Sequence, residues 1–141
     1  MSLSYLLDTC VVSEFVKAKP DKNVLAWLNS MDAERVYLSV ITLGEVQQGI
    51  SNLPRSNRRA ELEEWLNEQL TTQFAGRILA LDAATLITWG QLIAPLKQQG
   101  RTMSVMDSLI AATAVHHRMT LVTRNVSDFQ HVDVGIFNPW Q

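Results

Sequence analysis

The sequence predicts an α/β fold, a single-domain α/β/α sandwich built on a parallel sheet. Short apolar segments suited to buried strands alternate along the chain with longer helical segments, and this alternation is typical of a parallel sheet covered by helices on both faces. The chain has the length of one domain, 141 residues, and such a domain buries roughly 68–70% of the surface of its unfolded chain. No linker, internal repeat or low-complexity tract divides it, so we expect one domain over residues 1–141.

Composition narrows the class of protein. Apolar residues make up 47% of the chain and charged residues 18%, and the net charge is −2. The chain therefore has no global positive field of the kind that general DNA binders carry. A nuclease remains open, because acids that hold metal ions present positive charge locally to phosphate. The single cysteine and the lack of a leader-like start predict a cytoplasmic protein, and no apolar run is long enough for a membrane span.

The predicted elements follow from periodicity and from breaking residues. Strands are expected at residues 5–7, 36–40, 77–81, 119–123 and 132–137, and helices at 10–17, 21–30, 42–53, 58–70, 82–99 and 105–117. Asp82 is expected to cap the helix that follows it. Two poor helix formers, Gly44 and Gly49, lie in one predicted helix and suggest close approach by backbone or ligand.

Three carboxylates occur in apolar surroundings. Asp8 ends the first strand, Glu45 lies in an apolar helix, and Asp107 opens the most apolar helix of the chain. A buried carboxylate costs several kcal/mol unless it is paired or neutralised, and no Lys or Arg lies within a helical turn of Glu45. We therefore expect a divalent cation, Mg²⁺ or Mn²⁺, because these ions prefer oxygen ligands. The loop after the fourth strand offers Asp128 and Asn125 as a fourth ligand.

Each acid also has a structural interpretation. Asp8 can be a turn or N-cap residue, and Asp107 can form a capping box with Ser104. Glu45 can be hydrogen-bonded or simply exposed, and Asp128 can form an Asx turn. No single acid decides between these interpretations and a metal site.

Four stretches together resemble the PIN-domain family, and most closely its VapC and FitB toxin branch. They are Leu6-Leu7-Asp8-Thr9, Thr42-Leu43-Gly44-Glu45, residues 106–114 and residues 123–129, and the likeness extends to the terminal Phe137-Asn138-Pro139-Trp140. The resemblance implies a metal-dependent endoribonuclease that cleaves RNA with metal-activated water. It also implies the toxin of a type II toxin–antitoxin module, a homodimer held inactive by a small DNA-binding antitoxin of the VapB or FitA kind.

The resemblance also assigns the site. Asp8, Glu45 and Asp107 match the three invariant acids of the family and would hold Mg²⁺ or Mn²⁺. Asp128 is assigned as the fourth acid, with a catalytic and metal-binding role. Asn125 is an alternative ligand, or a residue that contacts the ligands and not the ion.

Two threonines match polar positions of the family, and one residue, Cys10, differs from the family pattern. Thr9 and Thr123 match polar positions beside the metal site, where their hydroxyls would orient carboxylates. Many relatives carry Asn where this chain has Cys10, and a thiol is a poor substitute for an amide hydrogen-bonding group. Support of Asp8 by this position is therefore in question, whereas Cys10 itself lacks the activating neighbours of a nucleophile.

Two other functions share part of this sequence pattern. The domain can be a catalytically weakened PIN-like binding or regulatory module, with Cys10 as the mark of a relaxed site. A phosphatase of the haloacid-dehalogenase type also begins with Asp after a first strand, but needs an acid where Cys10 stands. The basic cluster of Arg55, Arg58 and Arg59 is read as a solvated helix start, with RNA phosphate contact as the alternative.

Overall fold

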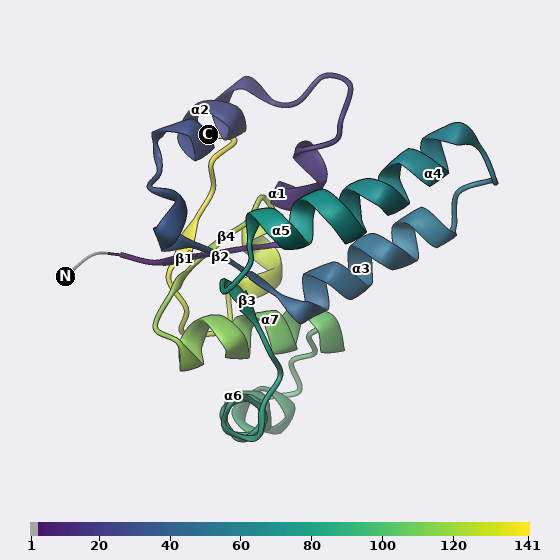
Figure 1. The fold of residues 1–141 in the computed structure, drawn as a ribbon. Coiled ribbons are helices and arrows are strands. Elements are labelled where there is room, and N and C mark those ends of the chain that lie inside the picture. Colours follow the sequence, from purple (N-terminus) through teal and green to yellow (C-terminus); the bar gives the residue numbers. More distant parts are fainter. Residues whose placement is uncertain (1–2) are drawn as a thin grey trace.

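The computed structural model describes residues 3–141 as a five-stranded sheet with helices on both faces (Figure 1). The strands are β1 (Tyr5–Leu7), β2 (Val36–Ser39), β3 (Ile78–Leu79), β4 (Thr120–Val122) and β5 (Ile136–Phe137). Their order across the sheet is β3-β2-β1-β4-β5, and every neighbouring pair is parallel. The predicted fold class is therefore confirmed.

The helices lie where the sequence predicts them, with differences at their ends. They are α1 (Thr9–Glu14), α2 (Lys22–Ser30), α3 (Val40–Ser51), α4 (Asn57–Glu64), α5 (Thr71–Gln73), α6 (Ala83–Gln98) and α7 (Val105–His116). Two 3₁₀ segments, η1 (Ala33–Arg35) and η3 (Val126–Phe129), and one π-helical segment, η2 (Trp65–Leu70), lie between them. No helix in residues 3–141 combines the length and the apolar character that crossing a membrane requires.

Side-chain caps explain where several helices begin. Asp82 accepts the backbone N–H of Thr85 at 2.9 Å, so its predicted role as the cap of α6 is confirmed. α3 begins two residues earlier than predicted, because the Ser39 hydroxyl accepts the N–H of Ile41 and ends β2 at that point. β2 therefore leads into α3 without a loop.

Four of the five strands, β2 to β5, are shorter than predicted, and the two largest differences, in β3 and β5, have tertiary reasons. β3 is an edge strand that pairs only with β2, and β2 ends at Ser39, so pairing stops at Leu79. The expected strand 132–137 shrinks to Ile136–Phe137, because the buried Val132 packs beside Phe129 of η3 instead. The predicted helix 58–70 continues as α4, η2 and α5, and its π-helical turns direct Leu66 and Leu70 into the core.

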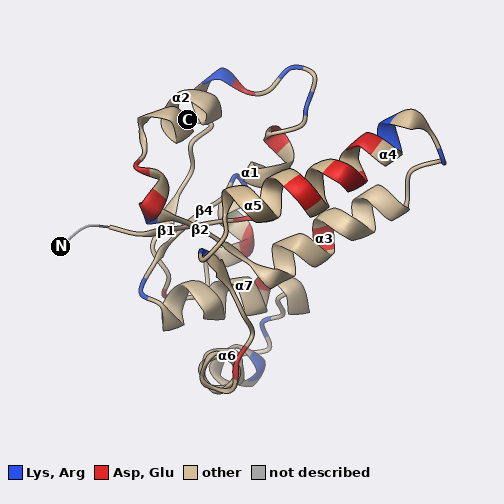
Figure 2. Ribbon diagram, viewed as in Figure 1, with Lys and Arg blue, Asp and Glu red and all other residues tan. Residues whose placement is uncertain are grey.

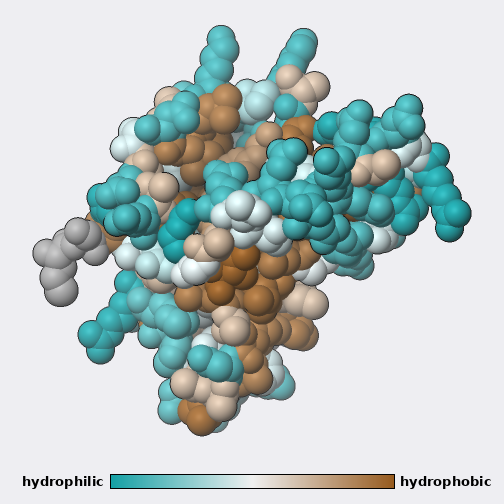
Figure 3. Space-filling view, viewed as in Figure 1, coloured by the Kyte–Doolittle hydropathy of each residue, from teal (hydrophilic) through white to brown (hydrophobic). Residues whose placement is uncertain are grey.

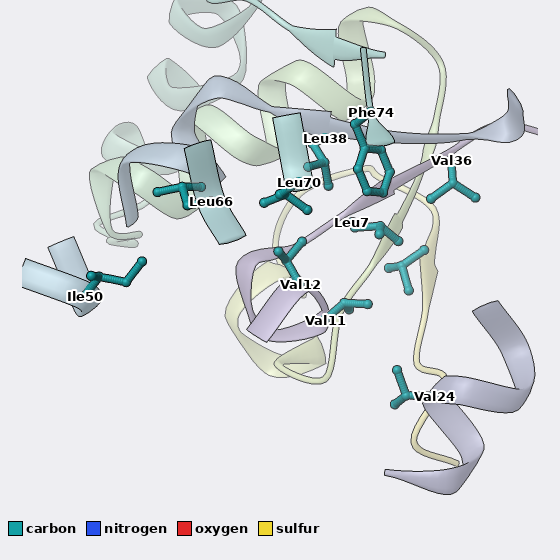
Figure 4. Close-up of a cluster of buried hydrophobic side chains, with 11 residues drawn as sticks. Leu7, Val11, Val12, Val24, Val36, Leu38, Ile50, Leu66, Leu70 and Phe74 are labelled. Carbon is teal, nitrogen blue, oxygen red and sulfur yellow. The ribbon is translucent and has the colours of Figure 1, made fainter. Parts of the chain in front are cut away.

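Two cores form on the two faces of the sheet, because consecutive strand residues point to opposite sides. Leu7 and Val122 join α1, α2 and η2 in one cluster, which Figure 4 shows around Leu7, Val11 and Val12. Leu6 and Leu121 face the other way and pack with α7 and η3. Helices therefore cover both faces, as the α/β/α prediction requires.

The backbone explanation for the two glycines of α3 is wrong within this chain. No atom of another element in residues 3–141 lies within 4 Å of the position that a Cβ would take at Gly44 or Gly49. The arm formed by α3 and α4 extends away from the sheet in Figure 1. A close approach at these positions would have to come from a ligand or another molecule, which stays a prediction.

Two glycines elsewhere give a prediction about stability. Gly76 has φ +80° in the turn before β3, whereas Gly90 lies inside α6 with space for a Cβ. Gly76→Ala is expected to lower the free energy of unfolding by about 1 kcal/mol, because L-residues are strained in this region. Gly90→Ala is expected to raise it by about 0.5–1 kcal/mol, because alanine favours the helix. Urea titration of both variants checks the opposite signs, and equal signs would contradict the backbone assignments.

Candidate active site

Asp8 lies where the strand order reverses. β1 is flanked by β2 on one side and β4 on the other, and Asp8 follows β1 at the carboxyl end of the sheet. Its N–H donates to the carbonyl of Val122 at 2.9 Å, which extends the β1–β4 ladder by one bond. In open α/β sheets ligands bind at this reversal, outside the carboxyl ends of the strands.

The two oxygens of the Asp8 carboxylate have different partners. Oδ1 accepts the N–H of Thr9 at 2.8 Å, so Asp8 is the N-cap of α1. Oδ2 accepts the hydroxyl of Thr123 at 2.7 Å, and the thiol of Cys10 lies 3.8 Å away. The cap interpretation is therefore correct, but it uses only one of the two oxygens and does not exclude a ligand role.

Glu45 is tied to the same corner through Thr9. The Thr9 hydroxyl donates to Glu45 Oε1 at 2.7 Å and lies 3.2 Å from the hydroxyl of Thr42. Glu45 is half-buried and borders a hollow of about 190 Å³ that Thr9, Ser13 and Gly49 also line. Thr42 was not predicted as a site residue, although its spacing of three residues before Glu45 places both on one helix face.

Asp107 opens α7 with a free carboxylate. Its backbone N–H donates to the Ser104 hydroxyl at 3.1 Å, which is half of the predicted capping box. Within residues 3–141 no hydrogen bond ties the Asp107 side chain back to Ser104, so the reciprocal half is missing. The half-buried carboxylate is therefore available for another role.

The electrostatics connect three of the acids. Burial raises the pKa of Asp8 above its ordinary value, and the negative charges of Asp107 and Glu45 raise it further. The hydrogen bonds from Thr123 and Thr9 lower the pKa of Asp8 but do not offset burial. Asp8 is thus a carboxylate at 5% exposure beside two other acids.

No cation of the described chain neutralises this group. The ion pairs within residues 3–141 join Lys17 to Glu14, Arg58 to Glu61 and Arg59 to Glu63, and none includes a candidate site acid. Figure 2 shows acidic segments near the sheet as well as along α4. Nevertheless, no three His, Cys, Asp or Glu side chains of residues 3–141 lie close enough together to enclose a metal ion.

The loop after β4 contributes through its backbone. The N–H of Asn125 donates to the Thr123 hydroxyl at 3.0 Å, so this hydroxyl is held from one side while it donates to Asp8. Asp128 is exposed in η3, and its N–H donates to the carbonyl of Asn125. The charges that raise the Asp8 pKa come from Asp107 and Glu45. The assignment of Asp128 or Asn125 as fourth ligand stays a prediction.

Cys10 takes part in the hydrogen bonding around Asp8. Its Sγ lies 3.8 Å from Asp8 Oδ2 and 3.7 Å from the Thr123 hydroxyl. Burial, followed by weaker effects that include the charge of Asp8, raises the pKa of the Cys10 thiol, so it stays protonated at neutral pH. A protonated thiol can donate weakly to Asp8 but cannot attack a substrate.

A larger hollow lies away from these acids. It measures about 440 Å³ between α1, α2, η2 and β2, and its walls include Phe15, Leu28, Trp65 and Phe74. None of the four predicted acids lines it. The lining also includes Asn29, Gln73 and Arg77 but no carboxylate that could hold a cation or activate water, so the candidate active site is the edge around Asp8.

Comparison with known proteins agrees with this architecture. Residues 5–135 match the model of the PIN domain. The toxin FitB of Neisseria gonorrhoeae is 39% identical over 135 residues, which cover 96% of this chain and 97% of that protein. The VapC ribonuclease Y4jK of Sinorhizobium fredii is 38% identical over 136 residues, with the same coverage.

A solved structure is similar over nearly the whole fold. The structure of FitAB bound to an IR36 DNA fragment contains a chain with a TM-score of 0.90 and 39% identity, covering 97% of this chain and 96% of that one. Sequence, fold and the position of the acids at the strand reversal lead to one family. This chain belongs to the PIN-domain family.

Proposed function

We propose that this chain is an Mg²⁺- or Mn²⁺-dependent endoribonuclease and the toxin of a type II toxin–antitoxin module. The observation that carries the proposal is Asp8, a buried carboxylate with a raised pKa and two acidic neighbours but no cationic partner within residues 3–141. Such a group is costly unless a cation binds it. The similarity to a protein named a VapC ribonuclease supports RNA as the substrate.

The residues present fit a hard divalent ion in their chemistry. Asp8, Glu45 and Asp107 would hold it, with Asp128 or Asn125 as the fourth ligand, and all of these offer oxygen atoms. No three of the described His, Cys, Asp or Glu side chains lie close enough together to enclose an ion. The proposed acids would therefore have to draw together on binding, with water and substrate phosphate completing the coordination, as is usual for Mg²⁺. When bound, it would supply a water of lowered pKa and neutralise charge on the phosphate.

The chain's own side chains prepare this site. Thr123 and the Thr9 N–H hold the two oxygens of Asp8 in fixed directions, and the Thr9 hydroxyl holds Glu45. The hydrogen bonds from Thr123 and Thr9 lower the pKa of Asp8, so they favour the ionised form that binds a cation. In the proposed hydrolysis the oxygen of water would bond to the phosphorus of the RNA backbone as the bond to the leaving ribose oxygen breaks. The proton lost by the water is balanced by the proton that the leaving oxygen takes up, so the products are a phosphate monoester and a ribose hydroxyl.

The toxin role and its partners are part of the same proposal. The similarity to the toxin FitB and to the FitAB complex on DNA supports a small DNA-binding antitoxin as partner. A homodimer is supported by exposed apolar side chains on α6 and at the start of α7, where Ile87 is 64% and Val105 is 63% exposed. Figure 3 shows an apolar patch on the face that includes α6. A cytoplasmic location follows from the same assignment.

RNA cleavage tests the proposed function. Purified protein is expected to cut single-stranded RNA with Mg²⁺ or Mn²⁺ and to lose this activity in EDTA, because the acids alone cannot stabilise the charge on phosphate. Restoring Mn²⁺ after EDTA is the control for irreversible damage. Equal cleavage with and without EDTA would contradict metal dependence, and no cleavage under any metal would contradict the ribonuclease.

A catalytically weakened binding module is the second candidate. The absence of a three-acid group within residues 3–141 and the presence of Cys10 favour it. Calorimetric titration with Mn²⁺ separates the two functions. The ribonuclease is expected to bind Mn²⁺ and to cleave RNA, whereas the module would do neither.

A further inference from the structure

Arg124 is the first residue after the Thr123 that holds Asp8. The Thr123 hydroxyl donates to Asp8 Oδ2 at 2.7 Å and accepts the backbone N–H of Asn125 at 3.0 Å, so the residues on both sides of Arg124 are held next to Asp8. The backbone of Arg124 is therefore anchored to the group of atoms around Asp8.

The side chain of Arg124 extends toward the C-terminal segment. Its guanidinium carbon lies 5.4 Å from the centre of the Trp140 ring, within the range of a cation–π interaction. Trp140 is itself fixed, because its N–H donates to Asn138 Oδ1 at 2.9 Å and its carbonyl accepts from Asn23 Nδ2 at 3.1 Å. In Figure 1 the C-terminus accordingly lies beside α2. The tryptophan thus holds an exposed cation in place.

The charge of Arg124 is uncompensated. Within residues 3–141 its guanidinium has no ion pair and no hydrogen-bond acceptor. The cluster on α4 differs, because Arg58 and Arg59 each pair with a glutamate and also donate to backbone carbonyls. Arg124 therefore keeps its donors free for an external acceptor.

A positive charge at this position would offset the repulsion between the site acids and the RNA in the proposed reaction. The acids repel RNA phosphate, so the approaching strand needs positive charge at the rim of the site. Arginine matches phosphate better than lysine does, because its planar fork can donate two parallel hydrogen bonds while one face stacks on an aromatic ring.

We propose that Arg124, held on Trp140, binds a backbone phosphate of the RNA strand where it crosses the sheet edge from β1 toward β5. This inference rests on the proposed ribonuclease function. It places the strand on the β4–β5 side of Asp8, opposite the hollow beside Glu45. It makes Arg124, rather than the paired Arg58 and Arg59 of α4, the phosphate contact.

Arg118 provides a matched control. Arg118 precedes β4 and Arg124 follows it, so the two arginines lie at opposite ends of one strand, and both are exposed. Arg118 has φ 56°, and Arg118→Gln keeps an unbranched side chain there, so backbone strain does not change. Arg124→Gln and Arg118→Gln remove the same charge from the two ends.

Binding is measured by fluorescence anisotropy of labelled single-stranded RNA, with Asp8→Asn as the common background to prevent cleavage. Arg124→Gln is expected to weaken binding about tenfold and to reduce the slope of log K against log salt by about 0.7. Arg118→Gln is expected to leave both unchanged. Trp140→Phe should retain most of the affinity, whereas Trp140→Leu, checked for folding by circular dichroism, should approach Arg124→Gln.

Cleavage in the otherwise wild-type protein separates this inference from the proposed function. Arg124→Gln is expected to raise KM about tenfold with kcat nearly unchanged, because the contact is made before and during reaction. If wild type cleaves RNA but Arg124→Gln binds RNA as tightly as its parent, the inference is wrong and the ribonuclease stands. Weakened antitoxin binding with unchanged RNA binding would also overturn it. If wild type does not cleave RNA, the proposed function itself is wrong.

Discussion

Asp8→Asn is expected to abolish RNA cleavage and, in the absence of metal, to make the protein more stable. The activity should fall by about 10³-fold, since a bound divalent ion supplies several kcal/mol of transition-state stabilisation and each tenfold change is about 1.4 kcal/mol. The amide keeps the shape of the side chain and the acceptor for the Thr9 N–H. Initial rates of RNA cleavage at saturating Mn²⁺ check the loss.

The stability change has a defined dependence on pH. Burial and acidic neighbours raise the pKa of Asp8 in the folded protein above its ordinary value of 3.8. Proton binding to Asp8 therefore favours the folded state below pH 3.8, and this contribution is lost as pH rises through the folded pKa. In EDTA, Asp8→Asn should match wild type near pH 3.8 and exceed it at neutral pH.

Thermal unfolding at both pH values measures this difference. Asp128→Asn serves as a control, because Asp128 is exposed and should show no comparable gain. Adding Mn²⁺ should stabilise wild type and leave Asp8→Asn unchanged, since binding to the folded state raises stability. A variant that cleaves RNA at the wild-type rate, or that is less stable than wild type at neutral pH, would contradict the role of Asp8.

The sequence was sufficient for the position of Asp8 but not for its hydrogen bonds. A strand of three apolar residues that ends on an acid places that acid at a strand's carboxyl end, and the helix alternation predicts a parallel sheet. The pairing of β1 with β4 decides that Thr123, rather than another polar residue, reaches Asp8 Oδ2. Contacts between segments 115 residues apart depend on register, which local patterns do not contain.

The same limit explains the elements that were predicted too long. Ala80 and Leu81 suit a strand as well as Ile78 and Leu79 do, but β2 turns into α3 and offers them no partner. The pair of Arg124 and Trp140 was missed for a related reason. The sequence separates them by 16 positions, and only the packing of the C-terminal segment against α2 brings the ring under the guanidinium.

Thr123→Val is expected to lower RNA cleavage by about 10- to 100-fold, because groups that orient metal ligands typically contribute this much. Valine has nearly the same shape but cannot donate to Asp8 Oδ2 or accept the N–H of Asn125. Leaving a buried oxygen without its donor should also cost about 1–3 kcal/mol of stability. Thr123→Ser should restore most of the activity.

The pH profile distinguishes an orienting role of Thr123 from a general loss of folding. The Thr123 hydroxyl lowers the pKa of Asp8, so its removal raises that pKa further. The acidic limb of the kcat profile should therefore move to higher pH in Thr123→Val. Thr113→Val is the matched control, because Thr113 is equally buried and donates only to the carbonyl of Leu109. An unshifted acidic limb, or an equal loss in Thr113→Val, would show that Thr123 supports the fold and not the charge state of Asp8.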